Sequence, residues 1–347
     1  MNTVFNNILT KIKENKKYKI FLILITILFI LLICFYFSLT LSKTSNKQNV
    51  ELFIYQDYDF NKVFSELKQN NILKENNFTF NFTSKILSYN KHIKAGRYVV
   101  EPNTSIIKLV KKLRTGSQTP VKIVISNCRT EWEFCKKITA NLMISDTALH
   151  NQIMKMNFKY PNEIFYYVIP NTYEIYWNIS AKKLLDKLAN ETKLFWSKKA
   201  QKLKLSGFNE KQIIIIASIV NEETNKDDEK SQIAGVYINR LKKNMLLQAD
   251  PTVKFAVGDF SLKRIKGEHL QIDSPFNTYK NLGLPPAPIC LPSIASIYST
   301  LKYDKHDYIY FCAKEDFSGY HNFAATLQEH AANAIRYRKA LNARGIN

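Results

Sequence analysis

The chain contains 347 residues, 46% of them apolar, which is enough length and apolar content for about two folded domains and excludes wholesale disorder. Its 50 lysines and arginines outnumber its 29 acidic residues, giving a net charge of +21. Nine glycines, ten prolines and five cysteines exclude a collagen-like chain, a low-complexity chain and a disulfide-built scaffold.

The first predicted element is a membrane-spanning helix over residues 20–41. Its 22 residues, IFLILITILFILLICFYFSLTL, include no charged side chain. At about 1.5 Å per residue they span roughly 33 Å, which matches a hydrocarbon core of about 30 Å. The run is longer than the apolar part of a signal peptide and is followed by only a weak cleavage site, which favours an uncleaved anchor. A lipid-modified Cys34 is disfavoured because no small residue precedes it.

The lysines that flank this helix predict its orientation. Five lysines lie within residues 1–19, whereas Lys43 and Lys47 follow the span. Cytoplasmic flanks carry the excess of basic residues. We therefore expect residues 1–19 to be cytoplasmic, the helix to cross the cytoplasmic membrane once, and the rest of the chain to lie outside.

A small α+β unit is predicted over residues 50–120, after a polar linker at 42–49. The expected order is strand, helix, helix, strand and helix, and the elements are placed at 50–56, 59–67, 77–82, 96–100 and 104–110. This order resembles the LysM-like subdomain found beside cell-wall enzymes. A purely structural spacer is the alternative interpretation.

Residues 121–347 are predicted to form a second domain of mixed α/β structure. It begins with a strand at 121–125 and a helix for which Thr130 supplies the cap, and an amphipathic helix follows at 181–205. Together with the smaller unit this places the whole chain in the α+β class. No spacing of histidines and cysteines indicates a metal site.

Four cysteines would be available for disulfides outside the cytoplasm. Their spacing selects none of the three possible pairings, and free buried thiols are the simpler interpretation. The four are Cys128, Cys135, Cys290 and Cys312.

The most informative segment is a predicted helix that begins after Asn209. Asn209 and Gln212 match a variant of the capping box. Residues 213–220 are apolar almost throughout, which predicts burial, yet the helix ends on Glu222 and Glu223. Three apolar residues precede Glu223 at helical spacing, so Glu223 is the acid that continues the buried face.

Three effects are expected to raise the pKa of Glu223. Burial disfavours its anion, acidic residues lie on either side of it, and the C-terminal end of a helix disfavours negative charge. A carboxyl group that stays protonated near neutral pH can act as a general acid for glycosidic cleavage. The alternative is a solvated helix end whose acids point into water.

Residues 217–224, ASIVNEET, resemble the Ala-Ser-Ile-(Val/Ile)-Glu-x-Glu-Thr motif of the endolytic murein transglycosylases, the YceG-like family. The resemblance implies a YceG-like catalytic domain. Further elements of the family pattern follow in the same order, at 236–241, 245–253, 274–279, 283–289 and 308–330.

The resemblance implies cleavage of the β-1,4 bond between N-acetylmuramic acid and N-acetylglucosamine inside peptidoglycan strands, with formation of 1,6-anhydro ends. It places the catalytic acid on Glu223, requires no cofactor, and suggests a role in ending nascent strands beside peptidoglycan synthases. Two alternatives stay open: a membrane-anchored peptidoglycan-binding protein without activity, and a muramidase-type hydrolase. Nucleic-acid binding is disfavoured because the lysines are scattered and no recognition motif is present.

Polar residues of the matched motifs are expected to shape or line the substrate cleft. For Asp250 the alternatives are the second acid of a hydrolase and a turn residue before Pro251. His321 is expected to bind substrate or to orient Glu223, with a structural histidine as the alternative. The cleft residues are Asn239, Gln248, Asp250, Asn277 and Tyr279.

Two positions depart from the family pattern. Asn221 stands where the motif has its first glutamate, so an acid at that position cannot be essential in this protein. Asn171 replaces the aspartate of an upstream Phe-x-Pro-Asp-Thr-Tyr element, which puts a contribution of charge from that element in doubt.

Overall fold

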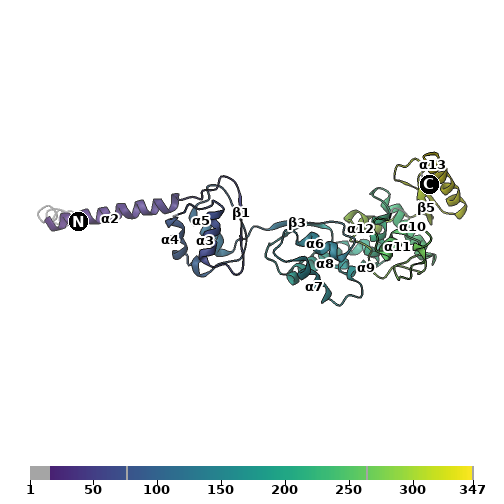
Figure 1. Ribbon diagram of the computed structural model, residues 1–347, viewed down its shortest axis with the longest axis horizontal. Helices are drawn as coiled ribbons and strands as arrows, with labels where there is room; N and C mark the ends of the chain where they lie inside the picture. The colour runs from purple at the N-terminus through teal and green to yellow at the C-terminus, as the bar shows by residue number, and fades with distance from the viewer. Residues whose placement is uncertain (1–15, 76, 263–264, 346–347) are drawn as a thin grey trace. The chain divides into compact units, whose positions relative to one another are not determined.

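The computed structural model describes residues 16–75, 77–262 and 265–345 (Figure 1). It divides into two compact units. The first ends at Pro120 and also takes in Tyr176–Asn178, and the second comprises Val121–Ile175 and the chain from Ile179 onward. Both units combine helices with two-stranded antiparallel sheets, which confirms the mixed α+β class.

The N-terminal apolar helix is present as predicted. Helix α2 (Lys16–Leu41) contains an uncharged stretch, and its window Lys19–Ser38 has a mean hydropathy of 3.2 with none of it buried. Among the described residues it is the one helix that is long and apolar enough to cross a membrane.

In the first unit, strand β1 (Val50–Ile54) pairs with β2 (Gly96–Val100). Three helices and a short 3-10 turn surround this ladder: α3 (Phe60–Gln69), α4 (Phe78–Ile86), η1 (Tyr89–Lys91) and α5 (Ile106–Thr115). The predicted start of α3 is confirmed, since the Asp59 side chain accepts a hydrogen bond from the Lys62 amide. Gly116 ends α5 at φ +73°, a conformation that glycine adopts without steric cost. The likeness to a LysM-like subdomain stays a prediction.

The segment 42–49, predicted as a linker, is hydrogen-bonded along the first unit. The Thr44 amide donates to the Thr104 carbonyl at 2.8 Å, and the Ser45 amide donates to the Ile72 carbonyl at 2.9 Å. The buried Asn46 side chain donates to the Val100 carbonyl at 3.0 Å. Helix α2 is therefore joined to this unit by ordered chain.

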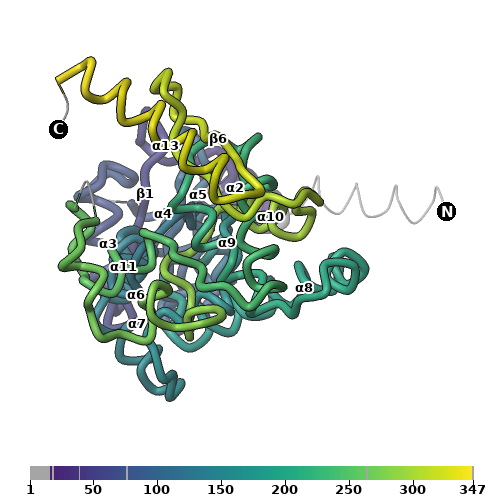
Figure 2. The backbone as a smooth tube through the Cα atoms, turned by 90° about the vertical axis from the view of Figure 1, so that its right-hand side faces the viewer, coloured from purple at the N-terminus to yellow at the C-terminus, as the bar shows by residue number. Residues whose placement is uncertain are grey.

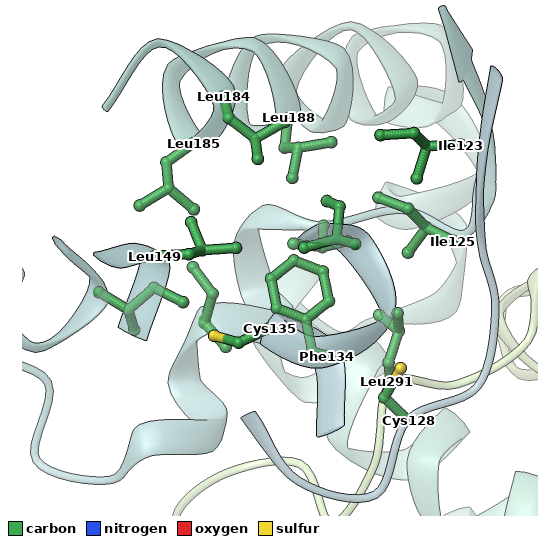
Figure 3. Packing of buried hydrophobic residues seen from close by; sticks show 14 of the residues in the cluster. Ile123, Ile125, Cys128, Phe134, Cys135, Leu149, Leu184, Leu185, Leu188 and Leu291 are labelled. Carbon is green, nitrogen blue, oxygen red and sulfur yellow. The ribbon is translucent and has the colours of Figure 1, made fainter. Parts of the chain in front are cut away.

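The second unit begins with the ladder of β3 (Val121–Ile125) and β4 (Asn171–Ile175). Around it lie α6 (Glu131–Thr139), α7 (Asp146–Met154), η2 (Pro161–Tyr167) and α8 (Ala181–Ser206), and Thr130 caps α6 as predicted. Figure 3 shows the ring of Phe134 within the apolar core that these elements share. Cys128 and Cys135 are buried in the same core, and Cys290 is buried elsewhere in the unit; all of the chain's cysteines are free thiols.

The rest of the second unit is built around helix α9 (Glu210–Glu223), whose residues 213–220 are all buried. Helices α10 (Lys230–Lys242) and α12 (Ile294–Leu301) pack against it, and α11 (Asp250–Val257) and η3 (His269–Gln271) follow α10 in the chain. The hairpin of β5 (Tyr310–Ala313) and β6 (His321–Ala324) lies beside α13 (Leu327–Ala343), as Figure 2 also shows. The prediction of a buried helix that ends on two acids is therefore confirmed.

Candidate active site

Glu223, the last residue of α9, lines a cavity of about 380 Å³. The capping box predicted for this helix is present, with Asn209 and Gln212 exchanging side-chain to backbone hydrogen bonds of 2.9 Å. Because residues 213–220 are held in the core, the last turn of α9 carries the Glu223 carboxylate to the cavity wall. Residues from α10, α11, β5 and α13, and from the loops before and after α11, complete the wall: Tyr237, Arg240, Leu247, Gln248, Asp250, Tyr279, Tyr310, Phe311, Leu327 and His330.

The surroundings of Glu223 raise its pKa to about 7. Burial is the largest cause, and the negative charges of Asp250 and Glu222 act in the same direction. Two groups oppose the rise: the Tyr237 hydroxyl donates a hydrogen bond to the Glu223 carboxylate, and the Arg240 guanidinium favours its anion. Near neutral pH, Glu223 is therefore poised between its protonated and ionised forms.

Arg240 fixes the part of the wall formed by residues 246–248. This side chain is 8% exposed, and its Nε donates to the Ile309 carbonyl at 2.6 Å. Its Nη1 donates to the Leu247 carbonyl at 2.9 Å and to Oε1 of Gln248 at 3.1 Å. Gln248 adopts φ +47°, a left-handed conformation that is uncommon for a residue with a side chain. The hydrogen bonds from the Arg240 guanidinium thus stabilise the unfavourable backbone conformation of Gln248 at the cavity.

Asp250 supplies a second carboxylate to the same cavity. It is the first residue of α11, where the helix dipole favours an anion. The Tyr279 hydroxyl donates to its Oδ1 at 2.6 Å, and burial raises the pKa of that hydroxyl, so the donor stays protonated. The Tyr279 hydroxyl therefore orients the Asp250 carboxylate toward the cavity that both residues line.

A second cavity of about 270 Å³ also includes Glu223 and Asp250 in its wall. On this side Nε of Arg129 lies 3.0 Å from Oε2 of Glu222, so the neighbouring acid is paired with a cation. The two carboxylates are thus shared by two adjoining cavities, which would allow an extended ligand to run past Glu223. The remaining wall residues are Arg129, Glu222, Pro251, Lys254 and Ile265.

His330 carries an unsatisfied polar atom beside this site. Its ring stacks on Tyr310 at 5.1 Å between centroids, and within the described part of the chain its buried Nδ1 has no hydrogen-bond partner. Burial, together with the charge of Arg240, lowers the pKa of His330. Its imidazole is therefore neutral at pH 7.

The structure places three of the expected cleft residues away from both cavities. The Asn239 side chain donates to the His306 carbonyl at 2.6 Å, and the buried Asn277 donates to the Leu270 and Ile272 carbonyls. Nδ1 of His321 lies 2.7 Å from the buried Glu229, and its amide donates to the same carboxylate. Gln248, Asp250 and Tyr279, by contrast, line the cavity with Glu223.

Tyr237, Arg240 and His330 were not singled out as site residues from the sequence. Tyr237 and Arg240 are spaced i, i+3 on α10, which is the spacing of one helix face. Two polar side chains on one face of a largely buried helix are the sequence feature that could have indicated a site there. His330 follows the first three residues of α13, and only the folded hairpin of β5 and β6 brings it near α10.

The two positions that depart from the family motif have structural partners. Oδ1 of Asn221 accepts hydrogen bonds of 3.0 Å from the Ser293 amide and from the Ser296 hydroxyl, where α12 begins. Asn171 is exposed at the start of β4, and its side chain accepts from the Thr172 amide. Among residues 16–75, 77–262 and 265–345, no group of three histidine, cysteine or acidic side chains could hold a metal ion.

Comparison with known protein families identifies the family to which this chain belongs. The model of the YceG-like family matches residues 52–336. The chain belongs to the YceG-like family. Among YceG-like proteins of known structure, one from Listeria monocytogenes is similar, with a TM-score of 0.53 and 27% identity, covering 83% of this chain and 99% of that one.

Two curated relatives carry the name endolytic murein transglycosylase. The protein of Bacillus subtilis (strain 168) is 28% identical over 324 residues, which cover 86% of this YceG-like chain and 87% of the relative. The protein of Streptococcus pneumoniae serotype 2 (strain D39 / NCTC 7466) is 26% identical over 304 residues, covering 78% of this chain and 55% of the relative. The chain thus spans about half the length of the Streptococcus protein.

Proposed function

We propose that this protein is an endolytic lytic transglycosylase of peptidoglycan. The observation that carries the proposal is Glu223, a carboxyl group whose pKa is raised to about 7 and which lines a cavity together with Asp250. A general acid works best when its pKa lies near the pH of the reaction. The name shared by the relatives, endolytic murein transglycosylase, supports the same substrate and reaction.

In the proposed reaction, protonated Glu223 donates its proton to the oxygen of the β-1,4 bond between N-acetylmuramic acid and N-acetylglucosamine. The bond from that oxygen to C1 of the muramoyl residue breaks, and positive charge develops on the ring. The Glu223 carboxylate then accepts the proton of the muramoyl C6 hydroxyl, whose oxygen bonds to C1. The products are a 1,6-anhydro end and a free 4-hydroxyl group, and no water is consumed.

Tyr237 and Arg240 would stabilise the Glu223 anion between the two proton transfers, because both groups favour its charged form. The Asp250 carboxylate, oriented by Tyr279, would stabilise the developing positive charge. Gln248, Tyr279 and the neutral His330 would bind polar groups of the sugars. Asn239, Asn277 and His321 would shape the cleft indirectly, by holding the loops and strands around it.

The same proposal covers the arrangement of the chain. Residues 1–19 would be cytoplasmic, α2 would cross the cytoplasmic membrane, the 50–120 unit would act as a LysM-like subdomain, and the domain over 121–347 would act outside. Peptidoglycan strands near the membrane, and the synthases that extend them, would then be within reach.

The deciding experiment compares the full chain with Glu223→Gln on purified peptidoglycan, by mass spectrometry of the released fragments. We expect the wild type to release internal fragments with 1,6-anhydro ends, and Glu223→Gln to bind strands without cleaving them. The matched control is Glu222→Gln, which neutralises the adjacent acid and should still cleave. Anhydro products from Glu223→Gln would contradict the assignment of the acid. Fragments heavier by one water would indicate a hydrolase, and binding without cleavage by the wild type would indicate a non-catalytic binding protein.

A further inference from the structure

Helix α4 presents an apolar stripe whose two end residues are exposed. Phe78 and Ile86 are 66% and 63% exposed, and Phe82 lies between them at helical spacing. The rings of Phe78 and Phe82 stack at 5.6 Å. The opposite face, with Phe80, Thr83 and Ser84, is buried in the unit. We call Phe78, Phe82 and Ile86 the α4 stripe.

The α4 stripe contacts the apolar part of α2 through one pair of aromatic rings. The ring of Phe82 lies 5.1 Å from that of Phe35, edge to face. Phe35 lies three residues before the end of the apolar window Lys19–Ser38, which corresponds to about 5 Å along a helix axis. An amphipathic helix at a bilayer surface buries its apolar face to a depth of about 5–10 Å. The α4 stripe therefore lies at the depth where such a helix would sit.

The chain between α2 and β1 is hydrogen-bonded to the rest of the first unit, which keeps α4 beside the end of α2. The Ser42 carbonyl, directly after α2, accepts a hydrogen bond of 2.9 Å from the Ile106 amide at the start of α5. Lys43 and Ser105 form the adjoining β-bridge. Helix α5 in turn packs on α4. A membrane that surrounds α2 would thus meet α4 directly.

The charges around the stripe suit an anionic surface. Between residues 74 and 94 there are four lysines and one acid, Glu75, and α4 itself contains no acidic residue. Lysines near a bilayer are attracted to anionic headgroups. The four are Lys74, Lys85, Lys91 and Lys94.

We propose that the α4 stripe inserts into the outer leaflet of the membrane that α2 crosses, so that the first unit lies flat on an anionic bilayer. The inference rests on the proposed membrane anchor and is independent of the chemistry at Glu223. An isolated exposed phenylalanine needs no explanation, but a contiguous apolar patch marks a binding surface. Contact with the anchoring helix identifies lipid as the partner.

The test uses the full chain in vesicles of phosphatidylethanolamine and phosphatidylglycerol whose acyl chains carry bromine, a contact quencher of tryptophan. We expect Phe78→Trp and Ile86→Trp to add emission that shallow bromines quench on the order of two-fold, as burial to about 5–10 Å requires. Leu205→Trp, at a 79% exposed apolar residue on α8, gives the comparison value for an exposed apolar position outside α4. The two α4 variants should be quenched more strongly than Leu205→Trp.

A fourth variant separates the inference from the anchor on which it rests. Leu28→Trp, in the middle of α2, should be quenched by bromine deep in the acyl chain. Quenching of Leu28→Trp without quenching of Phe78→Trp or Ile86→Trp would refute the lipid contact of α4 alone. If Leu28→Trp is not quenched, the anchor and the inference are both refuted. The same follows if the purified protein is found to have lost α2 by cleavage in the cell.

Discussion

The titration of Glu223 predicts the pH dependence of the proposed activity. With the ordinary pKa of 4.5, about one Glu223 in 300 would be protonated at pH 7, whereas a pKa of about 7 leaves about half protonated. Since the protonated form is the general acid, we expect the rate of strand cleavage to fall above pH 7, about tenfold for each further pH unit. The assay is the release of anhydro-ended fragments over the range of about pH 5 to 9.

The Tyr237→Phe variant tests the origin of this pH dependence. The Tyr237 hydroxyl favours the Glu223 anion, so its removal should raise the pKa of Glu223 further. A hydrogen bond to a charged group contributes about 1.5–3 kcal/mol, and 1.36 kcal/mol corresponds to about one pH unit. The protonated form of Glu223 can also form a hydrogen bond with this hydroxyl, which reduces the difference between the two forms. We therefore expect the alkaline limb of the pH–rate profile to move to higher pH by about one unit.

Tyr310→Phe provides the matched control, because Tyr310 lines the same cavity but stacks on His330. Its alkaline limb should stay near pH 7, whatever happens to the maximal rate. A limb that stays in place, or moves to lower pH, in Tyr237→Phe would refute the reasoning that Glu223 titrates against this hydroxyl. Loss of the fold is checked by thermal unfolding of each variant.

Three further outcomes follow from the same contacts. Asp250→Asn removes a negative charge that raises the pKa of Glu223, so its alkaline limb should move to lower pH in the same assay. Glu223→Gln should be more stable than the wild type at pH 8 and equal to it near pH 4.5, measured by thermal unfolding, because stability from a raised folded-state pKa is lost as pH rises through that pKa. Arg240→Lys cannot keep the bonds to Ile309 and Gln248 together, and we expect it to lower the free energy of unfolding by about 2–4 kcal/mol, measured with urea.

The helix that carries the candidate acid could be predicted because its signals are local. Asn209 and Gln212 lie within one turn, and the apolar run that ends at Glu223 is contiguous in the sequence. Spacing along a single helix was therefore enough to place Glu223 on the buried face. The caps at Asp59 and Thr130 were predictable for the same reason.

The groups that tune Glu223 were not predictable, because tertiary packing brings them together. Tyr237 contacts the Glu223 carboxylate only when α10 packs on α9. Arg240 is positioned by hydrogen bonds to the carbonyl of Ile309, directly before β5, and to that of Leu247, in the loop before α11. A motif also does not distinguish a polar side chain that meets substrate from one that closes a turn. Asn277, which donates to two carbonyls seven and five residues earlier in the chain, is the clearest case.

Asn221 illustrates how a motif acid can be exchanged without loss of the fold. Its side-chain oxygen accepts hydrogen bonds from Ser293 and Ser296, and a carboxylate could accept the same two. The position therefore requires an acceptor rather than a charge. A neutral side chain here also spares Glu223 one more negative neighbour, since Glu222 and Asp250 already raise its pKa.

A group that first gives a proton and then takes one back must be able to exist in both forms at one pH. Burial alone would hold Glu223 protonated and make its anion too costly to form, whereas Tyr237 and Arg240 alone would keep it ionised. The site contains both influences, and together they leave the pKa of Glu223 at about 7. The substrate's own hydroxyl would then serve as the nucleophile, so Asp250 need not activate water and can remain hydrogen-bonded to Tyr279. This division of roles is why we favour transglycosylation over hydrolysis for a site with two carboxylates.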